Sequence, residues 1–260
     1  MRNKKSKRIK AYIIFLLLII QLLFLSGCWN NRDLTDINLV AGFGIDKTED
    51  GKILLTVQVV EPAAIQSASS GQGSVGGQQP KPVFVESSEG DTVFEAIRRM
   101  LSKVDKKLFA STAQILILGE SISKDGINEI LDFFQRNHEV KYELDVLVAR
   151  GVSSREILEI ESDIDSIPAM YIRGIIENNV SRGMSKKTML IDLIKDINFN
   201  GNQFAIGQIT KVSERAVAAE GIAVFSDGKL VGWLNPTETR GYLFAVNKIR
   251  STIVNILTDD

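Results

Sequence analysis

The sequence predicts an α/β fold of the mixed α+β kind, with an N-terminal mixed-sheet domain and a smaller region of strands and one helix. Between residues 83 and 160, segments of strand character alternate with amphipathic segments of helical period, as in a sheet covered by helices. After residue 200, strand-like segments follow one another directly. A stretch over residues 67–79, rich in Ser, Gly and Gln, has no apolar periodicity and is expected to be a mobile loop.

Alternation and apolar runs predict the strands of the first domain. Leu55, Val57 and Val59 alternate with polar residues, as in a strand with one buried face. Ile115, with the three apolar residues that follow it, forms a compact run typical of a fully buried strand. The expected strands cover residues 39–45, 53–60, 83–85, 114–118 and 142–149.

Apolar stripes and capping residues predict the helices. Ser153 and Glu156 have the spacing of a capping box, and Pro168 is favourable in a first turn. The expected helices are residues 91–104 with Asp91 or Thr92 near the cap, 124–137, a short one after Ser153, one beginning near Pro168, and 188–197. The side chains expected to face the core are Val93, Phe94, Ile97, Met100, Leu101 and Val104 in the first helix, and Ile127, Ile130, Leu131 and Phe134 in the second.

A hairpin and a long helix are expected after residue 200. Asp227 and Gly228 supply the positive φ angles that a two-residue hairpin turn needs. The expected strands are 204–212, 216–225 and 230–234, and the expected helix is 238–257. We therefore divide the chain into residues 1–27, 28–200 and 201–260, with a soft boundary near residue 200.

The N-terminus has the pattern of an export signal. Residues 1–10 carry six Lys or Arg and no acid, and residues 11–25 are apolar except for Gln21. Leu25, Ser26 and Gly27 then precede Cys28, the single cysteine, and the run resembles a bacterial lipobox. The resemblance implies that the signal peptide 1–27 is removed and that Cys28 carries a diacylglyceryl lipid with acyl chains of the palmitate type.

Two other interpretations of this segment remain. An uncleaved anchor is one, although fifteen apolar residues are short against the roughly 20 that span a bilayer. A lone buried cysteine is the other. A chain with two acyl groups would be held stably on a membrane without spanning it.

Charge and composition exclude several classes of protein. The net charge is −1, and removal of the six positive charges of the leader lowers it to about −7. A nucleic-acid-binding protein would carry a basic patch, so no nucleic acid is expected as a partner. The net negative charge also speaks against electrostatic adhesion of the protein to a membrane, so the covalent lipid on Cys28 is expected to provide the anchor.

No catalytic or metal-binding pattern stands out. His138 is the single histidine and follows a predicted helix, where a solvated loop position is expected. Gly42 and Gly44 lack the third glycine of a dinucleotide fingerprint and precede a turn rather than a helix. We expect no enzyme, no metal and no cofactor other than the lipid on Cys28.

Three segments together resemble the Ger(x)C family, the C subunits of spore germinant receptors. Residues 27–34 read Gly-Cys-Trp-Asn-Asn-Arg-Asp-Leu and lead to Gly-Phe-Gly-Ile-Asp at 42–46. Residues 115–120 read Ile-Leu-Ile-Leu-Gly-Glu, and residues 221–225 with 229–234 and 238–241 complete the match. Asn30 and Asp33 replace the commoner Asp and Glu of the family.

The resemblance implies a non-enzymatic, lipid-anchored receptor subunit. It would lie on the outer face of the inner spore membrane and act with membrane-spanning A and B subunits in nutrient-triggered germination, with no direct small-molecule ligand. It also implies that the chain lacks the C-terminal domain of the family. In the matching segments, Trp233 is expected at the core or a domain interface, and Glu238 and Arg240 are candidates for an ion pair or an interface. The alternatives are a solute-binding lipoprotein that captures a nutrient itself and a lipid-anchored hydrolase.

Overall fold

The computed structural model describes residues 8, 10, 12–19, 21, 37–62, 64–65, 81–199, 202–249 and 251–252. The chain divides into two compact units, Met1–Ile37 and Asn38–Asp260. In the first unit, residues 12–19 are helical and exposed. Among the described residues, no helix is both long enough and apolar enough to cross a membrane. The predicted lipobox (Leu25, Ser26, Gly27 and Cys28) and the loop 67–79 lie outside the described residues.

The second unit is built on a ten-stranded mixed sheet, in the part of the chain that the structure describes. Its strands are β1 (Ile37–Lys47), β2 (Ile53–Val60), β3 (Val83–Gly90), β4 (Lys107–Phe109), β5 (Ile115–Leu118), β6 (Asp145–Ala149), β7 (Phe204–Ser213), β8 (Ala216–Ala218), β9 (Ile222–Ser226) and β10 (Lys229–Leu234). The order across the sheet is β10-β9-β7-β6-β5-β1-β2-β3, while β4 pairs with β1 and β8 with β7.

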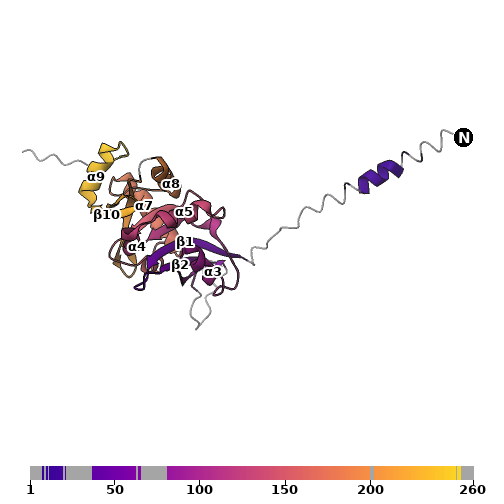
Figure 1. Cartoon of the computed structure of the whole chain (residues 1–260), viewed down its shortest axis with the longest axis horizontal. Coiled ribbons are helices and arrows are strands. Elements are labelled where there is room, and N and C mark those ends of the chain that lie inside the picture. Colours follow the sequence, from indigo (N-terminus) through magenta and orange to yellow (C-terminus); the bar gives the residue numbers. More distant parts are fainter. Residues whose placement is uncertain are drawn as a thin grey trace, which may run out of the picture. The chain divides into compact units, whose positions relative to one another are not determined.

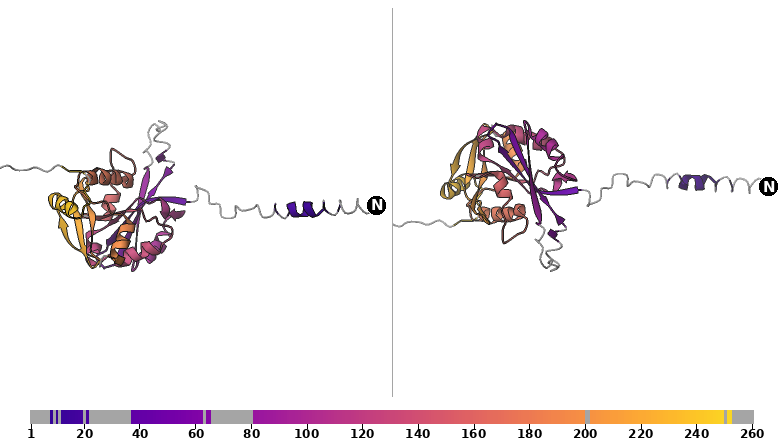
Figure 2. Two further views of the ribbon diagram at one scale, coloured as in Figure 1. Left: turned by 90° about the horizontal axis from the view of Figure 1, so that it is seen from above. Right: turned by 90° about the horizontal axis from the view of Figure 1, so that it is seen from below.

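Helices connect these strands and cover the sheet on both sides (Figures 1 and 2). They are α3 (Val93–Met100), α4 (Glu120–Asp125), α5 (Asn128–Arg136), α6 (Ser154–Leu158), α7 (Pro168–Ser181), α8 (Leu190–Phe199) and α9 (Pro236–Ala245), with a 3-10 turn at Ala110–Thr112. The predicted mixed α+β class is confirmed by this arrangement.

The centre of the sheet is parallel and its flanks are antiparallel. Strand β1 pairs in parallel with β5, β5 with β6, and β6 with β7. Antiparallel pairing joins β1 to β2 and β2 to β3 on one flank, and β7 to β9 and β9 to β10 on the other. The four parallel strands therefore end at one common edge of the sheet, where their connecting loops gather.

Each face of the sheet has its own apolar core. Buried residues of α3, α4, α5 and α8 pack on one face, with Phe134 among the largest of them. Buried residues of α6 and α7, including Ile157 and Ile172, pack on the other. Strand β5 contributes to both cores, since Leu116 and Leu118 face one side and Ile115 and Ile117 the other. This explains why all four of its residues are apolar.

The local signals for helix starts and turns are confirmed. The Ser153 hydroxyl accepts a hydrogen bond from the Glu156 N–H, and the Glu156 carboxylate accepts one from the Ser153 N–H, which completes the capping box. Thr92 caps α3, and Pro168 opens α7. Asp227 and Gly228 both have positive φ angles, 54° and 72°, as the hairpin turn requires.

Several predicted boundaries are wrong. Strand β3 extends to Gly90 rather than residue 85, and β6 begins at Asp145 rather than residue 142. The helix expected at 124–137 begins only at Asn128, since Gly126 has a φ of +130° that a helix does not accept and residues 124 and 125 end the preceding helix α4. The strand expected at 216–225 is interrupted in the same way by Gly221, whose φ is +94°.

Two helices are shorter than predicted. The first, α3, ends at Met100, and Phe94 and Leu101 are 60% and 48% exposed although both were expected in the core. The last, α9, ends at Ala245, and Asn247 follows it with a φ of +54°.

The sheet continues across residue 200, where we predicted a boundary. Strand β7 pairs with β6, so residues before and after that position share one sheet and one compact unit. The soft boundary near residue 200 therefore does not interrupt the structure.

Candidate functional site

The carboxyl ends of β1, β5, β6 and β7 lie at one edge of the sheet, which we call the carboxyl edge. Asp46, Gly119, Arg150 and Lys211 lie on it. The backbone holds it together, because Gly119 N–H donates to the Ile45 carbonyl (2.8 Å) and Arg150 N–H to the Ile209 carbonyl (3.0 Å). In open sheets of this kind, ligands bind outside the carboxyl ends of parallel strands, so this edge is the first place to look for a functional site.

Asp46 is the buried acid of the carboxyl edge. It is 7% exposed and anchors the start of α6. Its carboxylate accepts hydrogen bonds from the Ser154 N–H, 3.1 Å from each oxygen, and from the Ser154 hydroxyl at 2.6 Å. Burial raises the pKa of Asp46 above its usual 3.8, and the hydrogen bonds from Ser154 and Arg155 only partly offset this.

Glycines make this arrangement possible. A Cβ on Gly44 would lie 2.3 Å from the Ser154 Oγ, and one on Gly119 would lie 2.1 Å from the Asp46 Oδ1. A Cβ on Gly42 would lie 2.9 Å from Ile115 Cγ1. The Gly-x-Gly-Ile-Asp segment is thus a packing and capping element for α6.

Trp233 connects the hairpin β9–β10 to the carboxyl edge. The Arg150 guanidinium carbon lies 5.0 Å from the centroid of the half-buried indole, a cation–π contact. Arg150 Nη1 also donates to the Gln208 Oε1 at 3.4 Å. Trp233 further packs against the larger core. These contacts place the side chain at the edge of the core, and its role at an interface stays a prediction.

Glu238 caps its own helix. It is exposed, and its Oε2 accepts a hydrogen bond from the Asn235 N–H at 2.8 Å, while the Asn235 Oδ1 accepts from the Glu238 N–H at 2.9 Å. Arg240, one turn inside α9, is half-buried. Sequence reasoning treated Glu238 as a partner for an ion pair and missed the capping box, although Asn235 three residues earlier is the signal for it.

We expect Glu238→Ala to lower the free energy of unfolding by about 1 kcal/mol, because the start of α9 loses its reciprocal cap. Glu238→Gln should change it by no more than roughly a third of that, since glutamine can accept the same hydrogen bond from Asn235 N–H. Urea unfolding of the two variants beside the unmodified protein measures the difference. Equal losses in both would show that charge, and not the cap, is what Glu238 contributes.

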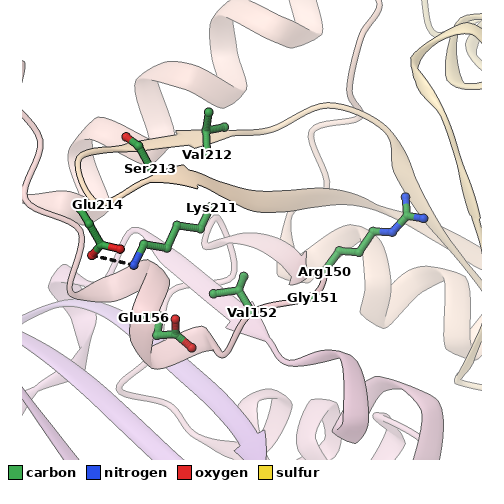
Figure 3. Close-up of a pocket in the computed structure, with 8 residues that line it drawn as sticks. All are labelled: Arg150, Gly151, Val152, Glu156, Lys211, Val212, Ser213 and Glu214. Atoms are coloured by element: carbon green, nitrogen blue, oxygen red, sulfur yellow. Dashed lines mark hydrogen bonds and ion pairs between the residues drawn. The ribbon is translucent and has the colours of Figure 1, made fainter.

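A shallow cavity of about 370 Å³ opens beside the carboxyl edge (Figure 3). The β6–α6 loop and the β7–β8 hairpin line it with Arg150, Gly151, Val152, Glu156, Lys211, Val212, Ser213 and Glu214. Its charged groups are engaged: Lys211 Nζ lies 2.8 Å from the Glu214 Oε2, and Glu156 belongs to the capping box. Figure 3 shows Arg150 directed away from this ion pair. The charged side chains that line the cavity are thus engaged in contacts within the fold.

A second polar cluster surrounds the start of β6, at the opposite edge. Asp145 is 2% exposed, and its Oδ2 lies 3.4 Å from Lys187 Nζ and 3.9 Å from Arg173 Nε. Burial raises the pKa of Asp145 above its usual 3.8, although both cations oppose this. Nearby, burial lowers the pKa of Lys186 to about 8, and its ammonium donates to the Ala205 carbonyl at 2.6 Å. These contacts fix the chain between α7 and β7.

His138 is exposed just past α5, as expected for a solvated loop position. Over the described residues, no group of three or more His, Cys, Asp or Glu is arranged to hold a metal ion. The candidate residues of the sequence thus fall into separate places: Trp233 at the carboxyl edge, Glu238 and Arg240 on α9, and Cys28 outside the described residues.

Comparison with known families covers almost the whole second unit. The pattern described as "spore germination protein N-terminal domain" matches residues 30–211. The chain belongs to this family. A second pattern, "spore germination B3/GerAC like, C-terminal", matches residues 220–260. Both matches confirm the resemblance to the Ger(x)C proteins, and the Gly-x-Gly-Ile-Asp segment lies within the first.

Individual relatives are similar over most of this chain. Spore germination protein KC of Bacillus subtilis (strain 168) is 27% identical, over 95% of this chain and 65% of that protein. Spore germination protein YndF of the same organism is 29% identical, over 93% of this chain and 63% of the relative. Spore germination protein B3 of that organism is 26% identical, over 92% of this chain and 63% of that protein. The chain thus spans less than two thirds of the length of these relatives.

Among solved structures, a crystal structure of the GerBC protein is similar with a TM-score of 0.36 and 16% sequence identity. The similarity covers 80% of this chain and 56% of that chain.

Proposed function

We propose that this chain acts in spore germination as a non-catalytic subunit of a nutrient germinant receptor. The observation that carries the proposal is the family match, which spans residues 30–211 and continues over 220–260. Three relatives that cover most of the chain are named spore germination proteins. The subunit acts by assembling with membrane-spanning A and B subunits or by relaying their signal.

The anchor of this subunit is a diacylglyceryl lipid on Cys28. The basic residues of the leader, its apolar run and Leu25-Ser26-Gly27 before the cysteine support the assignment. Two acyl chains hold a protein stably at a membrane surface, at about 0.8 kcal/mol for each buried methylene. The lipid places the protein on the outer face of the inner spore membrane, within reach of the other subunits.

Two features of the structure favour an interaction subunit over an enzyme. The charged side chains of the cavity at the carboxyl edge form an ion pair, cap a helix or, in the case of Arg150, contact Trp233 and Gln208. Asp46, the buried acid of that edge, is 7% exposed, is hydrogen-bonded to Ser154 and lies close against Gly119. These residues stabilise the fold, and the exposed surface is left for partners.

Deletion of the gene in frame should abolish germination in response to one nutrient class and leave a receptor-independent trigger effective. The full chain should restore the response. Cys28→Ala should not, and most of the variant should move from the membrane fraction to the soluble fraction or retain its leader, because no acyl chains hold it. Germination assays and fractionation of the same spores measure both effects.

Ser26→Ala is the matched control, since it keeps a small residue before the cysteine and should rescue fully. Normal germination of the deletion strain on every nutrient tested would contradict the proposed function. Full rescue by Cys28→Ala would contradict the anchor alone.

A further inference from the structure

Large apolar side chains are exposed around the start of β1. Phe84 and Phe109 are each 37% exposed and Leu101 is 48% exposed. With Lys103, Lys106 and Lys107 they form a surface that we call the β1 rim. Exposed apolar side chains that gather at one place, with polar residues around them, indicate a surface that contacts a partner or a membrane.

Backbone pairing brings the strands of Phe84 and Phe109 to the start of β1, and one side-chain contact links the segment after Leu101 to it. Phe84 pairs with Val59, which in turn pairs with Val40 near the start of β1. Phe109 belongs to β4, which pairs with β1 directly. Leu101 follows α3, and four residues later Asp105 accepts a hydrogen bond from Asn38 Nδ2 at 3.3 Å. Figure 1 shows α3 beside β2, which it contacts.

One segment of the rim, which connects α3 to β4, is richer in cations than the chain as a whole. The segment from residue 98 to 109 contains five basic residues and one acidic residue, Asp105, although the whole chain has a net charge of −1. Lys103 and Lys107 keep 47% and 43% of their side chains exposed. Their partners Glu86 and Glu139 are themselves at the surface, where such ion pairs are weak and exchange readily for other anions.

Covalent geometry limits how far this rim can be from a bilayer. If Cys28 carries the lipid, ten residues lead from it to Asn38, and ten residues span at most about 36 Å when fully extended. The chain enters the sheet at β1, so the part of the fold nearest to its anchor along the chain is the surface around Asn38. This step rests on the proposed function.

We propose that the β1 rim rests on an anionic phospholipid surface, with Phe84, Leu101 and Phe109 at the headgroup level and the lysines on the phosphates. Half-exposed aromatic and aliphatic side chains bounded by lysines are what an interfacial contact uses, since the long lysine stems lie along apolar surface while the ammonium groups stay in the headgroup layer. The contact would fix one orientation of the sheet relative to the membrane.

The test uses the full chain with Cys28→Ser and one new cysteine that carries an environment-sensitive fluorophore. Leu101→Cys and Phe109→Cys report the rim. Val231→Cys is the matched control, because Val231 is 63% exposed on β10, at the far end of the strand order. Each protein is mixed with vesicles of phosphatidylcholine alone or with one third phosphatidylglycerol.

We expect the fluorescence at positions 101 and 109 to shift to the blue on the anionic vesicles, with quenching by lipid-borne quenchers about twofold or more above that at 231. Changing Lys103, Lys106 and Lys107 together to glutamine should remove this excess, as should molar salt. As the control, changing Lys52, Lys124 and Lys229, which lie outside the rim, to glutamine should leave the excess quenching at positions 101 and 109 unchanged.

Quenching at positions 101 and 109 no greater than at position 231 would overturn the proposal. A blue shift on neutral vesicles as large as that on anionic vesicles would overturn it too. If the fluorescence of the two probes shifts to the blue only when the A and B subunits are present, the rim contacts a protein partner. That result would overturn the proposal as well. The vesicle assay does not depend on lipidation of Cys28, so its failure is distinct from failure of the proposed anchor, which the spore fractionation reports.

Discussion

Gly44→Ala should lower the free energy of unfolding by about 2–3 kcal/mol, because the new methyl group cannot be accommodated without moving α6. The Cβ would lie 2.3 Å from the Ser154 Oγ, 2.9 Å from the Ser154 Cβ and 3.1 Å from Leu158 Cδ1. Ser154 is held in turn by Asp46, so the hydroxyl has no free rotamer to retreat to without breaking a 2.6 Å hydrogen bond. Thermal or urea unfolding measures the loss.

The matched control is Gly174→Ala in the middle of α7. A Cβ at Gly174 meets nothing within 4 Å, and alanine is the better helix former, so this variant should gain about 0.5–1 kcal/mol. The two substitutions add the same atoms and should change stability in opposite directions. If Gly44→Ala unfolds at the same denaturant concentration as the unmodified protein, α6 is not packed against β1 as described.

Local features of the fold could be predicted from the sequence because each depends on a few adjacent residues. The capping box of Ser153 and Glu156, the hairpin turn at Asp227 and Gly228, and the buried strand β5 are of this kind. Capping, backbone handedness and apolar runs act over two to five residues, so no knowledge of the rest of the chain is needed.

Phe94 shows why the face of a helix was predicted wrongly. Its helix packs on β3 through small residues: Ser88 donates to the Ala96 carbonyl at 2.6 Å, and a Cβ on Gly90 would lie 2.5 Å from the Ala96 nitrogen. This close approach turns Ala96 into the core, where it is fully buried, and leaves Phe94 60% exposed. A stripe of large apolar residues does not reveal where a helix approaches a strand most closely.

The candidate site could be predicted only in part, since its contacts join residues far apart in the chain. Asp46 and Ser154 are separated by 108 residues, and Arg150 meets Trp233 only because β7, β9 and β10 extend the sheet. The sequence marks both regions as unusual, through two closely spaced glycines and an isolated tryptophan. It contains no signal that pairs one region with the other.

Asp46→Ala should cost roughly 2–3 kcal/mol at neutral pH, because the N–H and the hydroxyl of Ser154 would be left without an acceptor in a buried place. Asp50→Ala, in the exposed turn after β1, is the matched control and should change stability by less than about 0.5 kcal/mol. Urea unfolding at neutral pH compares the two. A loss below 1 kcal/mol in Asp46→Ala would mean that water replaces the carboxylate as the acceptor for Ser154.

The same carboxyl should also give the protein an unusual dependence on pH, visible as the difference in stability between the unmodified protein and Asp46→Asn. Burial raises the pKa of Asp46 in the folded state above its usual 3.8, so the native carboxyl holds its proton over a range of pH where the unfolded one has lost it. Stability from this group therefore falls as pH rises from 3.8 to the raised value and is constant above it. The asparagine variant does not titrate at this position, which isolates the contribution of Asp46 from other carboxyl groups.

On acidification from neutral pH, the unmodified protein should therefore gain stability relative to Asp46→Asn. Unfolding of both proteins in urea at half-unit steps from pH 7 to pH 3.5 measures the difference. A difference that shrinks on acidification would mean that the hydrogen bonds from Ser154 and Arg155 outweigh burial, with the carboxylate favoured in the folded state. The sign of that slope decides whether Asp46 is held at the start of α6 mainly as a charge or mainly as a buried polar group.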